Sequence, residues 1–419
     1  MRTTRRRPQP PERSVKPRIV HPTQRGRIGL ALAGGGPEGA VYEIGALRAL
    51  EEAFEGLDLN ALYTYVGVSA GAFIASALAN GITASQLARA LVKHEPGEHP
   101  FAPETFFTPA YREFGRRGLM LPRLLVDALL KFGRRPHDQR LLESLTRAAD
   151  ALPVGIFDNE PIRRYLEKIY SIKGRTDDFR KLRHHLVVIA TDLESGRAVR
   201  FGEPGQDHVP ISRAVQASTA FPGLYPPVMI DGRPCSDGVL LKTLHASVAL
   251  SHGVGLLLCV NPIVPADTTA GVARGELRPG TLLRRGLPAV LSQTFRTLVH
   301  SRLEIGLAAY KTRFPDADVL RFEPERDEYG MFFTRIFSFS SRRTVCQLAY
   351  AATRRDLRLR RTTIGPALER HGLRLRDDVL DDESRDLWSG VGLPEEVKSP
   401  MGRRLAQTLA GLEGAVRGA

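Results

Sequence analysis

The strongest constraint on the fold is a pair of stretches in which an apolar strand runs into glycines and then into a helix. The first is "RIGLALAGGGPEG", residues 27–39, and the second is "TYVGVSAGAF", residues 64–73. Apolar residues at three- and four-residue spacing predict helices from about Glu38 to Gly56 and from Ala70 to Ala79. Strand, glycine turn, helix and strand form one βαβ unit, so the sequence predicts an α/β protein with sites at the carboxyl ends of its strands.

Ser69 stands at the second turn, between Gly67 and Gly71. Glycine at both positions removes the Cβ atoms that would clash in a tight turn and lets the serine project outward. The following helix directs its first N–H groups toward negative charge that develops near the hydroxyl. This is the pattern of a nucleophile elbow, although a five-residue Gly/Ser motif also fits a plain structural turn.

The first turn matches the G-x-G-x-x-G template of dinucleotide-binding proteins through Gly34, Gly36 and Gly39. Those proteins hold the ribose with an acidic side chain at the end of the second strand. Here the second strand ends at Ser69, and Asp58 precedes that strand. The sequence therefore disfavours nucleotide binding.

The same turn can instead hold an oxyanion, because a loop without side chains exposes backbone N–H groups. The two strands of a βαβ unit are expected to be neighbours, which brings the glycine turn beside Ser69. Pro37 has no N–H, so Gly35 and Gly36 are the better donors.

A serine nucleophile needs a base to accept its proton. Asp231, followed by Gly232, is explained by a hairpin turn, whereas Asp237, followed by Gly238, has no evident turn role. A Ser-His-Asp triad, as in an α/β-hydrolase, remains an alternative. The histidines available for it are His184, His185, His245 and His252.

Five blocks of sequence, in one order, give the chain a resemblance to a known family. They are "GGGPEG" (34–39), "GVSAG" (67–71), "IATDLESGR" (189–197), "ASTAFPGLYPPVMIDG" (217–232) and "DGV" (237–239). The chain resembles the patatin-like phospholipases over roughly residues 28–262, and five ordered blocks are more specific than one motif. The resemblance implies a three-layer α/β/α fold around a central, mostly parallel sheet.

The resemblance also implies a Ser-Asp dyad, with Ser69 as nucleophile and Asp237 as base, that cleaves lipid carboxylic esters through an acyl-enzyme. It assigns the oxyanion hole to Gly34, Gly35, Gly36 and Gly39, and the motif glycines to Gly67, Gly71 and Gly238. Burial should raise the basicity of the aspartate, whose ordinary pKa of about 3.9 makes it a weak base. No metal or organic cofactor is implied. The second hypothesis is a catalytically weak relative that binds lipid or a partner.

Two positions depart from the family pattern. The family usually carries Arg or Lys where this chain has Glu38, and the Asp-Gly motif ends in Val239 rather than Gly or Ala. A carboxylate that points toward the oxyanion would oppose its charge, whereas one that points outward at the start of a helix meets the helix dipole favourably. We expect Glu38 to point outward.

Outside the five blocks, composition and pattern divide the chain. Residues 1–27 predict a disordered basic tail, residues 28–262 the catalytic domain with a helical insertion at about 83–180, and residues 263–419 a mostly helical C-terminal extension. The insertion is either a lid or a covering layer. An apolar face within 287–310 is expected to lie in the core, through Val290, Leu291, Phe295, Leu298 and Leu303.

The net charge of +14 is concentrated in the tail, where residues 1–27 hold nine Lys or Arg and one Glu. The tail therefore either contacts an anionic membrane surface or is a solvated leader, and no nucleic acid is expected as a partner.

No apolar run reaches the ~18–20 residues of a membrane span, and the N-terminus lacks the apolar core of a secretory signal. Three scattered cysteines, Cys235, Cys259 and Cys346, predict buried thiols in a reducing compartment, the cytoplasm.

Overall fold

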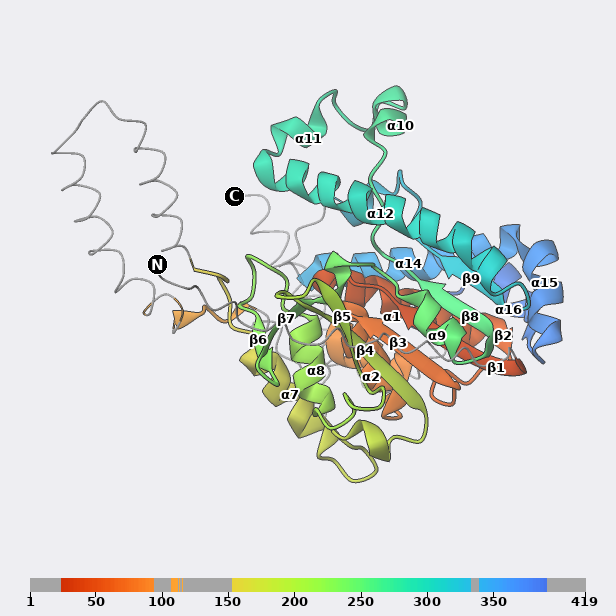
Figure 1. Ribbon diagram of the computed structural model, residues 1–419. Helices are drawn as coiled ribbons and strands as arrows, with labels where there is room; N and C mark the ends of the chain where they lie inside the picture. Colours follow the sequence, from red (N-terminus) through yellow and green to blue (C-terminus); the bar gives the residue numbers. More distant parts are fainter. Residues whose placement is uncertain are drawn as a thin grey trace, which may run out of the picture.

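A central β-sheet organises the molecule (Figure 1). The computed structural model describes residues 24–93, 107–111, 113, 115, 153–332 and 339–389. Within them an eight-stranded sheet runs in the order β6-β7-β4-β3-β1-β8-β9, with β5 paired to β4. Its strands are β1 (Gln24–Leu32), β3 (Thr64–Val68), β4 (His185–Asp192), β5 (Arg197–Phe201), β6 (Val228–Ile230), β7 (Arg233–Asp237), β8 (Val254–Val260) and β9 (Asp318–Phe322).

The middle of the sheet is parallel and one edge is antiparallel. β1 pairs in parallel with both β3 and β8, so that Leu30 lies opposite Tyr65 on one side and Leu258 on the other. β3–β4 and β8–β9 are also parallel, whereas β5, β6 and β7 pair antiparallel. The predicted α/β class with a mostly parallel sheet is confirmed.

One face of the sheet is covered by the two helices that the βαβ pattern predicted and by further helices. Alternate strand residues such as Leu30 and Leu32 belong to a core cluster with residues of these helices. The helices on this face are α1 (Gly36–Ala53), α2 (Ala70–Ala79), α3 (Ala84–Ala88), α7 (Glu160–Tyr170), α8 (Ile211–Ser218) and α14 (Phe339–Leu359). Pro37 in the first turn of α1 suits a position where no intrahelical N–H bond is needed.

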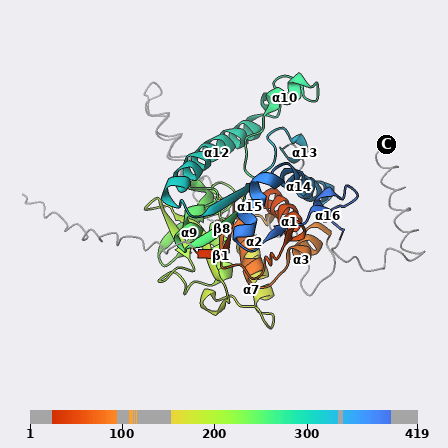
Figure 2. The same ribbon diagram turned by 90° about the vertical axis from the view of Figure 1, so that its right-hand side faces the viewer.

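The other face of the sheet is covered by α9 (Ala246–Ser251) and the long α12 (Leu287–Arg313). The intervening strand residues, such as Ala31 and Val66, pack there with Val248 and Leu303. Figure 2 shows α9 and α12 on one side of the sheet and α1 and α14 on the other. The architecture is thus the three-layer α/β/α arrangement expected from the sequence.

The remaining elements are short. Near the sheet lie the π-helix η1 (Arg89–Lys93) and the 3-10 turns η3 (Phe179–Lys181) and η4 (Gly238–Leu240). The C-terminal part adds α10 (Thr268–Ala273), α11 (Thr281–Arg284), α13 (Tyr329–Phe332), α15 (Arg361–Arg370) and α16 (Asp377–Asp381). A separate two-stranded sheet joins β2 (Phe54–Glu55) to β10 (Arg374–Leu375).

The C-terminal segment is integrated with the catalytic half of the chain. β9 extends the main sheet beside β8, and α14 packs along α1. A Cβ added at Gly45 of α1 would lie 2.3 Å from the Cys346 carbonyl oxygen, so the two helices approach as closely as glycine allows. Residues beyond 262 therefore complete the core.

Three expectations meet a different or partial outcome. β1 begins at Gln24, so the last four residues assigned to the tail are strand, and residues 1–23 lie outside the described residues. Much of the predicted insertion, including 94–106 and 116–152, also lies outside them. The apolar face of 287–310 was expected in the core, but Leu291 and Leu298 are 58% and 59% exposed. The expectation is confirmed for Leu303, which is buried, and is wrong for Leu291 and Leu298, because the buried side of α12 runs through Val299, Leu303 and Tyr310.

Candidate active site

Ser69 occupies a strained turn between β3 and α2. Its backbone has φ 54°, a left-handed conformation that a residue with a Cβ adopts only when its surroundings impose it. A Cβ at Gly67 would lie 2.5 Å from Ala72 Cα, and one at Gly71 would lie 2.5 Å from the Ala33 carbonyl oxygen. Both glycines are therefore required by close backbone approach, as the elbow pattern predicted. The serine side chain lies at the start of α2, and the residue is 6% exposed.

Asp237 ends β7, and its carboxyl group interacts electrostatically with the Ser69 side chain. Its Oδ1 accepts a hydrogen bond from the Val239 N–H at 2.9 Å, and the residue is 1% exposed. Burial raises the pKa of Asp237 to about 7, against the lowering effects of Ser69 and of the Val239 N–H. A carboxylate with a pKa near neutrality is a far better base than an ordinary aspartate.

Strand β4 joins the two side chains across the sheet. Val68 of β3 pairs with Ile189 of β4, and the next β4 residue, Ala190, pairs with Asp237 of β7. The serine that follows Val68 and the aspartate that ends β7 thus meet at one edge of the sheet. This pairing between distant segments brings the two residues together.

The glycine turn after β1 lies directly against the serine. A Cβ at Gly34 would be 3.2 Å from Ser69 Cβ, and the Gly71 N–H donates to the Ala33 carbonyl at 3.0 Å. Gly35 is the N-cap and Gly36 the first residue of α1, so their N–H groups have no intrahelical acceptor. Such N–H groups are suited to bind an oxyanion.

Gly39 does not fit the oxyanion role that the resemblance implied. Its N–H donates to the Gly35 carbonyl at 3.0 Å, inside the first turn of α1. Its missing side chain instead allows close packing, because a Cβ there would lie 3.1 Å from Pro262 Cγ. The expected oxyanion set is therefore reduced to Gly34, Gly35 and Gly36.

Ser218, at the end of α8, is a positioning residue that the sequence reasoning missed. Its hydroxyl accepts a hydrogen bond from the Ser69 N–H at 2.8 Å and donates one to the Ile189 carbonyl at 2.6 Å. It therefore ties the elbow backbone to β4. Its place in the "ASTAFPG" block could have indicated a role for Ser218, but the sequence analysis assigns it none.

Glu38 has a charged neighbour that the sequence could not reveal. It lies in the first turn of α1, is partly exposed, and interacts electrostatically with Arg296 of α12. The Arg296 guanidinium also donates to the Val264 carbonyl at 3.3 Å. A cation from α12 thus offsets the carboxylate that stands where the family usually has a basic residue. Gly238 follows Asp237 and packs against the Ile189 carbonyl, 2.5 Å from where its Cβ would be.

Comparison with known proteins decides the family. The model of the family described as patatin-like phospholipase matches residues 30–250, which is more than half of the 419-residue chain. The chain belongs to the patatin-like phospholipase family. The match contains Ser69, Asp237 and the glycine turn, and it ends before α12.

Solved structures similar to this patatin-like protein include two bacterial proteins at low identity. VipD from Legionella pneumophila is 14% identical, with 84% of this chain and 72% of VipD covered and a TM-score of 0.36. The type III effector ExoU is 14% identical, with 81% of this chain and 54% of ExoU covered and a TM-score of 0.33. This chain thus spans about half the length of ExoU. No curated protein sequence matches it.

The histidines of this patatin-like protein divide into two groups. His185 begins β4 and His252 precedes β8, at the amino ends of these strands, whereas Ser69 follows the carboxyl end of the parallel strand β3. Their rings meet edge to face at 4.4 Å, and burial lowers the pKa of His185 to about 4. His184 contacts the ring of Tyr65. His245 lies nearer the site, with Nε2 3.4 Å from the Gly238 carbonyl oxygen.

One group of potential metal ligands lies among the described residues. The ligand atoms of His300, Glu304 and Glu323 lie within 4.8 Å of one another. Arg321 forms ion pairs with both carboxylates, at 3.3 Å for Glu323, which already offsets their charge. The three cysteines of the chain are buried and free.

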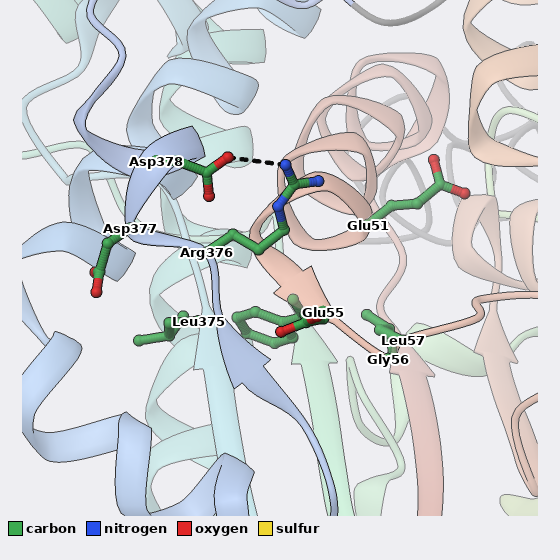
Figure 3. A pocket seen from close by; sticks show the side chains of 9 residues that line it. Glu51, Glu55, Gly56, Leu57, Leu375, Arg376, Asp377 and Asp378 are labelled. Atoms are coloured by element: carbon green, nitrogen blue, oxygen red, sulfur yellow. Dashed lines mark hydrogen bonds and ion pairs between the residues drawn. The ribbon is translucent and has the colours of Figure 1, made fainter.

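A surface hollow lies away from the proposed catalytic pair, between the end of α1 and the β10–α16 segment (Figure 3). Its lining is rich in carboxylates, and Arg376 pairs with Asp378 at 2.9 Å. The lining residues are Glu51, Phe54, Glu55, Gly56, Leu57, Leu375, Arg376, Asp377 and Asp378. Such a surface repels lipid phosphate.

Within the described residues, no helix is long and apolar enough to cross a membrane.

Proposed function

We propose that this protein is a serine acyl hydrolase that cleaves lipid carboxylic esters with Ser69 and Asp237. The observation that carries the proposal is the interaction between these two buried side chains, whose residues are 6% and 1% exposed. A buried carboxylate beside a strained serine has no evident structural advantage, since both desolvation and the positive φ cost free energy. Such strain is typical of catalytic turns.

The first step is attack of the Ser69 oxygen on the ester carbonyl while Asp237 accepts the hydroxyl proton. Because burial raises the pKa of Asp237 to about 7, the carboxylate is partly ionised at neutral pH and basic enough to take the proton. The Val239 N–H holds one carboxylate oxygen at 2.9 Å and fixes the direction of the other. The aspartate needs no histidine to perform this transfer.

The tetrahedral intermediate carries a negative charge on the former carbonyl oxygen. The N–H groups of Gly35 and Gly36 and the amino end of α2 supply positive electrostatic potential beside Ser69. Protonated Asp237 then gives its proton to the leaving alcohol as the carbon–oxygen bond breaks, which leaves an acyl-enzyme. Water, deprotonated by the same aspartate, attacks the acyl-enzyme and releases the fatty acid.

Lipid is the substrate class that family membership supports. The basic segment 1–27, of which 24–27 form part of β1, is proposed to contact an anionic membrane surface. We place the protein in the cytoplasm, because all three thiols are free and buried.

Labelling with a fluorophosphonate probe tests the proposal. Wild-type protein should be labelled covalently, and Ser69→Ala should abolish both the labelling and the hydrolysis of a panel of chromogenic esters and phospholipids. A wild type that is neither labelled nor active would favour the second hypothesis, a family member that binds lipid or a partner without turnover.

A pair of variants separates the dyad from a triad. Asp237→Asn should abolish turnover, whereas His245→Ala should leave it within a few-fold of wild type. Loss of turnover in His245→Ala, with an unchanged unfolding temperature, would favour a Ser-His-Asp triad, because His245 is the histidine near Gly238.

A further inference from the structure

Helices α11 and α12 expose a stripe of aliphatic side chains. The stripe consists of Leu283, Leu287, Leu291, Leu298 and Ile305, which are 76%, 68%, 58%, 59% and 70% exposed. Single exposed leucines are common on protein surfaces, but a series along one helix is not. We call these five residues the aliphatic stripe.

Helical geometry places four members of the stripe on one side of α12. Leu287, Leu291, Leu298 and Ile305 follow one another at spacings of four or seven residues, which keeps them within about 40° around the axis. They extend over roughly 27 Å at 1.5 Å per residue. The positions between them on this side are Thr294 and Ser301, which are uncharged. The buried residues of α12, such as Val299 and Leu303, lie on the opposite side.

The segment that carries the stripe is rich in positive charge. Residues 278–313 contain seven Arg or Lys and one carboxylate, Glu304. Glu304 forms an ion pair with Arg321 of β9, so its negative charge is already compensated. Arg278, Arg284 and Arg302 are exposed. An uncharged aliphatic face with basic flanks is typical of helices that lie in the plane of a membrane interface.

The same helix rests on the residues around Asp237. Phe295 packs edge-on against Phe221 at 5.4 Å, and the Ala220 carbonyl before that phenylalanine accepts the Asp237 N–H. On the other side, the Arg302 guanidinium donates to the Leu240 carbonyl at 3.2 Å. A surface that binds α12 therefore lies close to the proposed catalytic pair. Figure 1 shows α12 lying along the outer side of the molecule, with α10 and α11 beyond it.

We propose that the aliphatic stripe and its basic flanks dock on an anionic membrane surface. This deepens the proposed function, and rests on it, by naming the surface through which a lipid hydrolase meets its substrate. A stripe one helix wide fits between lipid headgroups, whereas a stable protein interface requires about 800 Å² per partner with close shape complementarity. The charge fits an anionic surface, because arginines snorkel toward phosphate while the aliphatic residues enter the acyl region.

Vesicle co-sedimentation tests the docking without involving catalysis. The parent protein is Ser69→Ala, which cannot turn over the lipid, and the vesicles are phosphatidylcholine alone or phosphatidylcholine with phosphatidylserine. Leu291→Asp/Leu298→Asp should bind the mixed vesicles at least about tenfold more weakly, because anions replace two leucines that would enter the acyl region. Leu359→Asp is the matched control, since Leu359 is 76% exposed on α14, and it should bind within about twofold of the parent.

A second variant keeps the test independent of folding. Circular dichroism melting should give the double variant the unfolding temperature of the parent. If the double variant unfolds at a lower temperature, Leu291→Ser/Leu298→Ser is used in its place. Leu298→Trp adds a reporter to a chain whose single tryptophan, Trp388, is 9% exposed. Its fluorescence should shift to the blue with the mixed vesicles, and an unshifted spectrum would contradict insertion.

Three other results would overturn the proposal. A double variant that binds vesicles like the parent would show that another surface docks on the membrane. A dimeric parent and a monomeric double variant in light scattering, with equal vesicle binding, would show that a second copy of the chain covers the stripe. Equal binding to phosphatidylcholine alone would remove the anionic requirement. A protein that fails fluorophosphonate labelling yet binds vesicles through the stripe would refute the proposed hydrolase and leave the docking intact.

Discussion

Helices α2 and α12 border the same site and are built on opposite principles. All ten residues of α2 are buried, whereas only three of the 27 residues of α12 are buried. α2 is apolar on every side because the sheet, α1 and α8 surround it. α12 has one apolar side toward the sheet and a second toward solvent. The comparison shows that an apolar pattern identifies side chains suited to burial, but does not identify what those side chains contact.

The difference extends to what each helix contributes. α2 provides a rigid backbone that holds Ser69 in a strained turn, since every neighbour of that turn is fixed. α12 provides charge and surface, through Arg296 near Glu38 and the aliphatic stripe. Substitutions should therefore act on chemistry and stability at α2 and on electrostatics and docking at α12.

The largest effect should come from Ser69→Ala at the start of α2. Loss of the nucleophile should lower kcat/KM for a water-soluble ester by roughly 10⁴-fold or more. Ser301→Ala on α12, an exposed serine, is the control and should leave kcat/KM within about twofold. Similar rates in Ser69→Ala and wild type would show that the elbow serine is a structural residue.

Asp237→Asn should lower kcat/KM by roughly 10³-fold or more and change how stability depends on pH. The folded pKa is raised to about 7, so the folded chain keeps a proton that the unfolded chain loses near pH ~4. The stability of wild type should therefore fall as pH rises through about 7, and the asparagine variant should be more stable by about 2–4 kcal/mol at pH ~8.

The measurements for Asp237 are urea unfolding at several pH values and the pH profile of kcat/KM, which should rise through about pH 7 in wild type. Asp231→Asn is the matched control, because Asp231 lies in a hairpin turn with φ 49° that asparagine tolerates. A wild-type profile that is flat between pH 5 and 9 would argue against Asp237 as the base.

A glycine in each helix gives the next comparison. Gly71→Ala in α2 places a Cβ 2.5 Å from backbone atoms of Leu32 and Ala33, so it should cost about 2–4 kcal/mol of unfolding free energy. Gly306→Ala in α12 places it 3.6 Å from the Tyr310 hydroxyl, an ordinary contact, and should stabilise by about 0.5–1 kcal/mol. Urea unfolding measures both, and equal effects would refute the contrast between the helices.

The smallest effect should come from Arg296→Met. Without this cation the Glu38 carboxylate is less well compensated beside the oxyanion turn, and kcat should fall about three- to tenfold. Adding Glu38→Gln should restore most of the rate, because the opposing charge is then absent. A double variant as slow as Arg296→Met would mean that Arg296 acts through packing on Phe332, which lies 5.3 Å from its guanidinium.

Local pattern was sufficient for the first βαβ unit. The run at 64–68 is a strand, and Ala70–Ala79 is the helix expected from its spacing. These segments are strongly patterned and buried, so local preference and tertiary packing agree. Ser69 and Asp237 were named from motif order, which reports their types and places in the chain.

The sequence by itself determined the α/β class, the elbow and the two residues proposed for catalysis, because backbone preference and close glycine packing are local properties. Only the tertiary structure decided that the Ser69 and Asp237 side chains interact, that the Gly39 N–H is bonded within α1, and that Arg296 neighbours Glu38. It also decided that Leu291 and Leu298 face outward. These facts depend on which distant segments pack together, and a pattern of apolar and polar residues does not specify the partner.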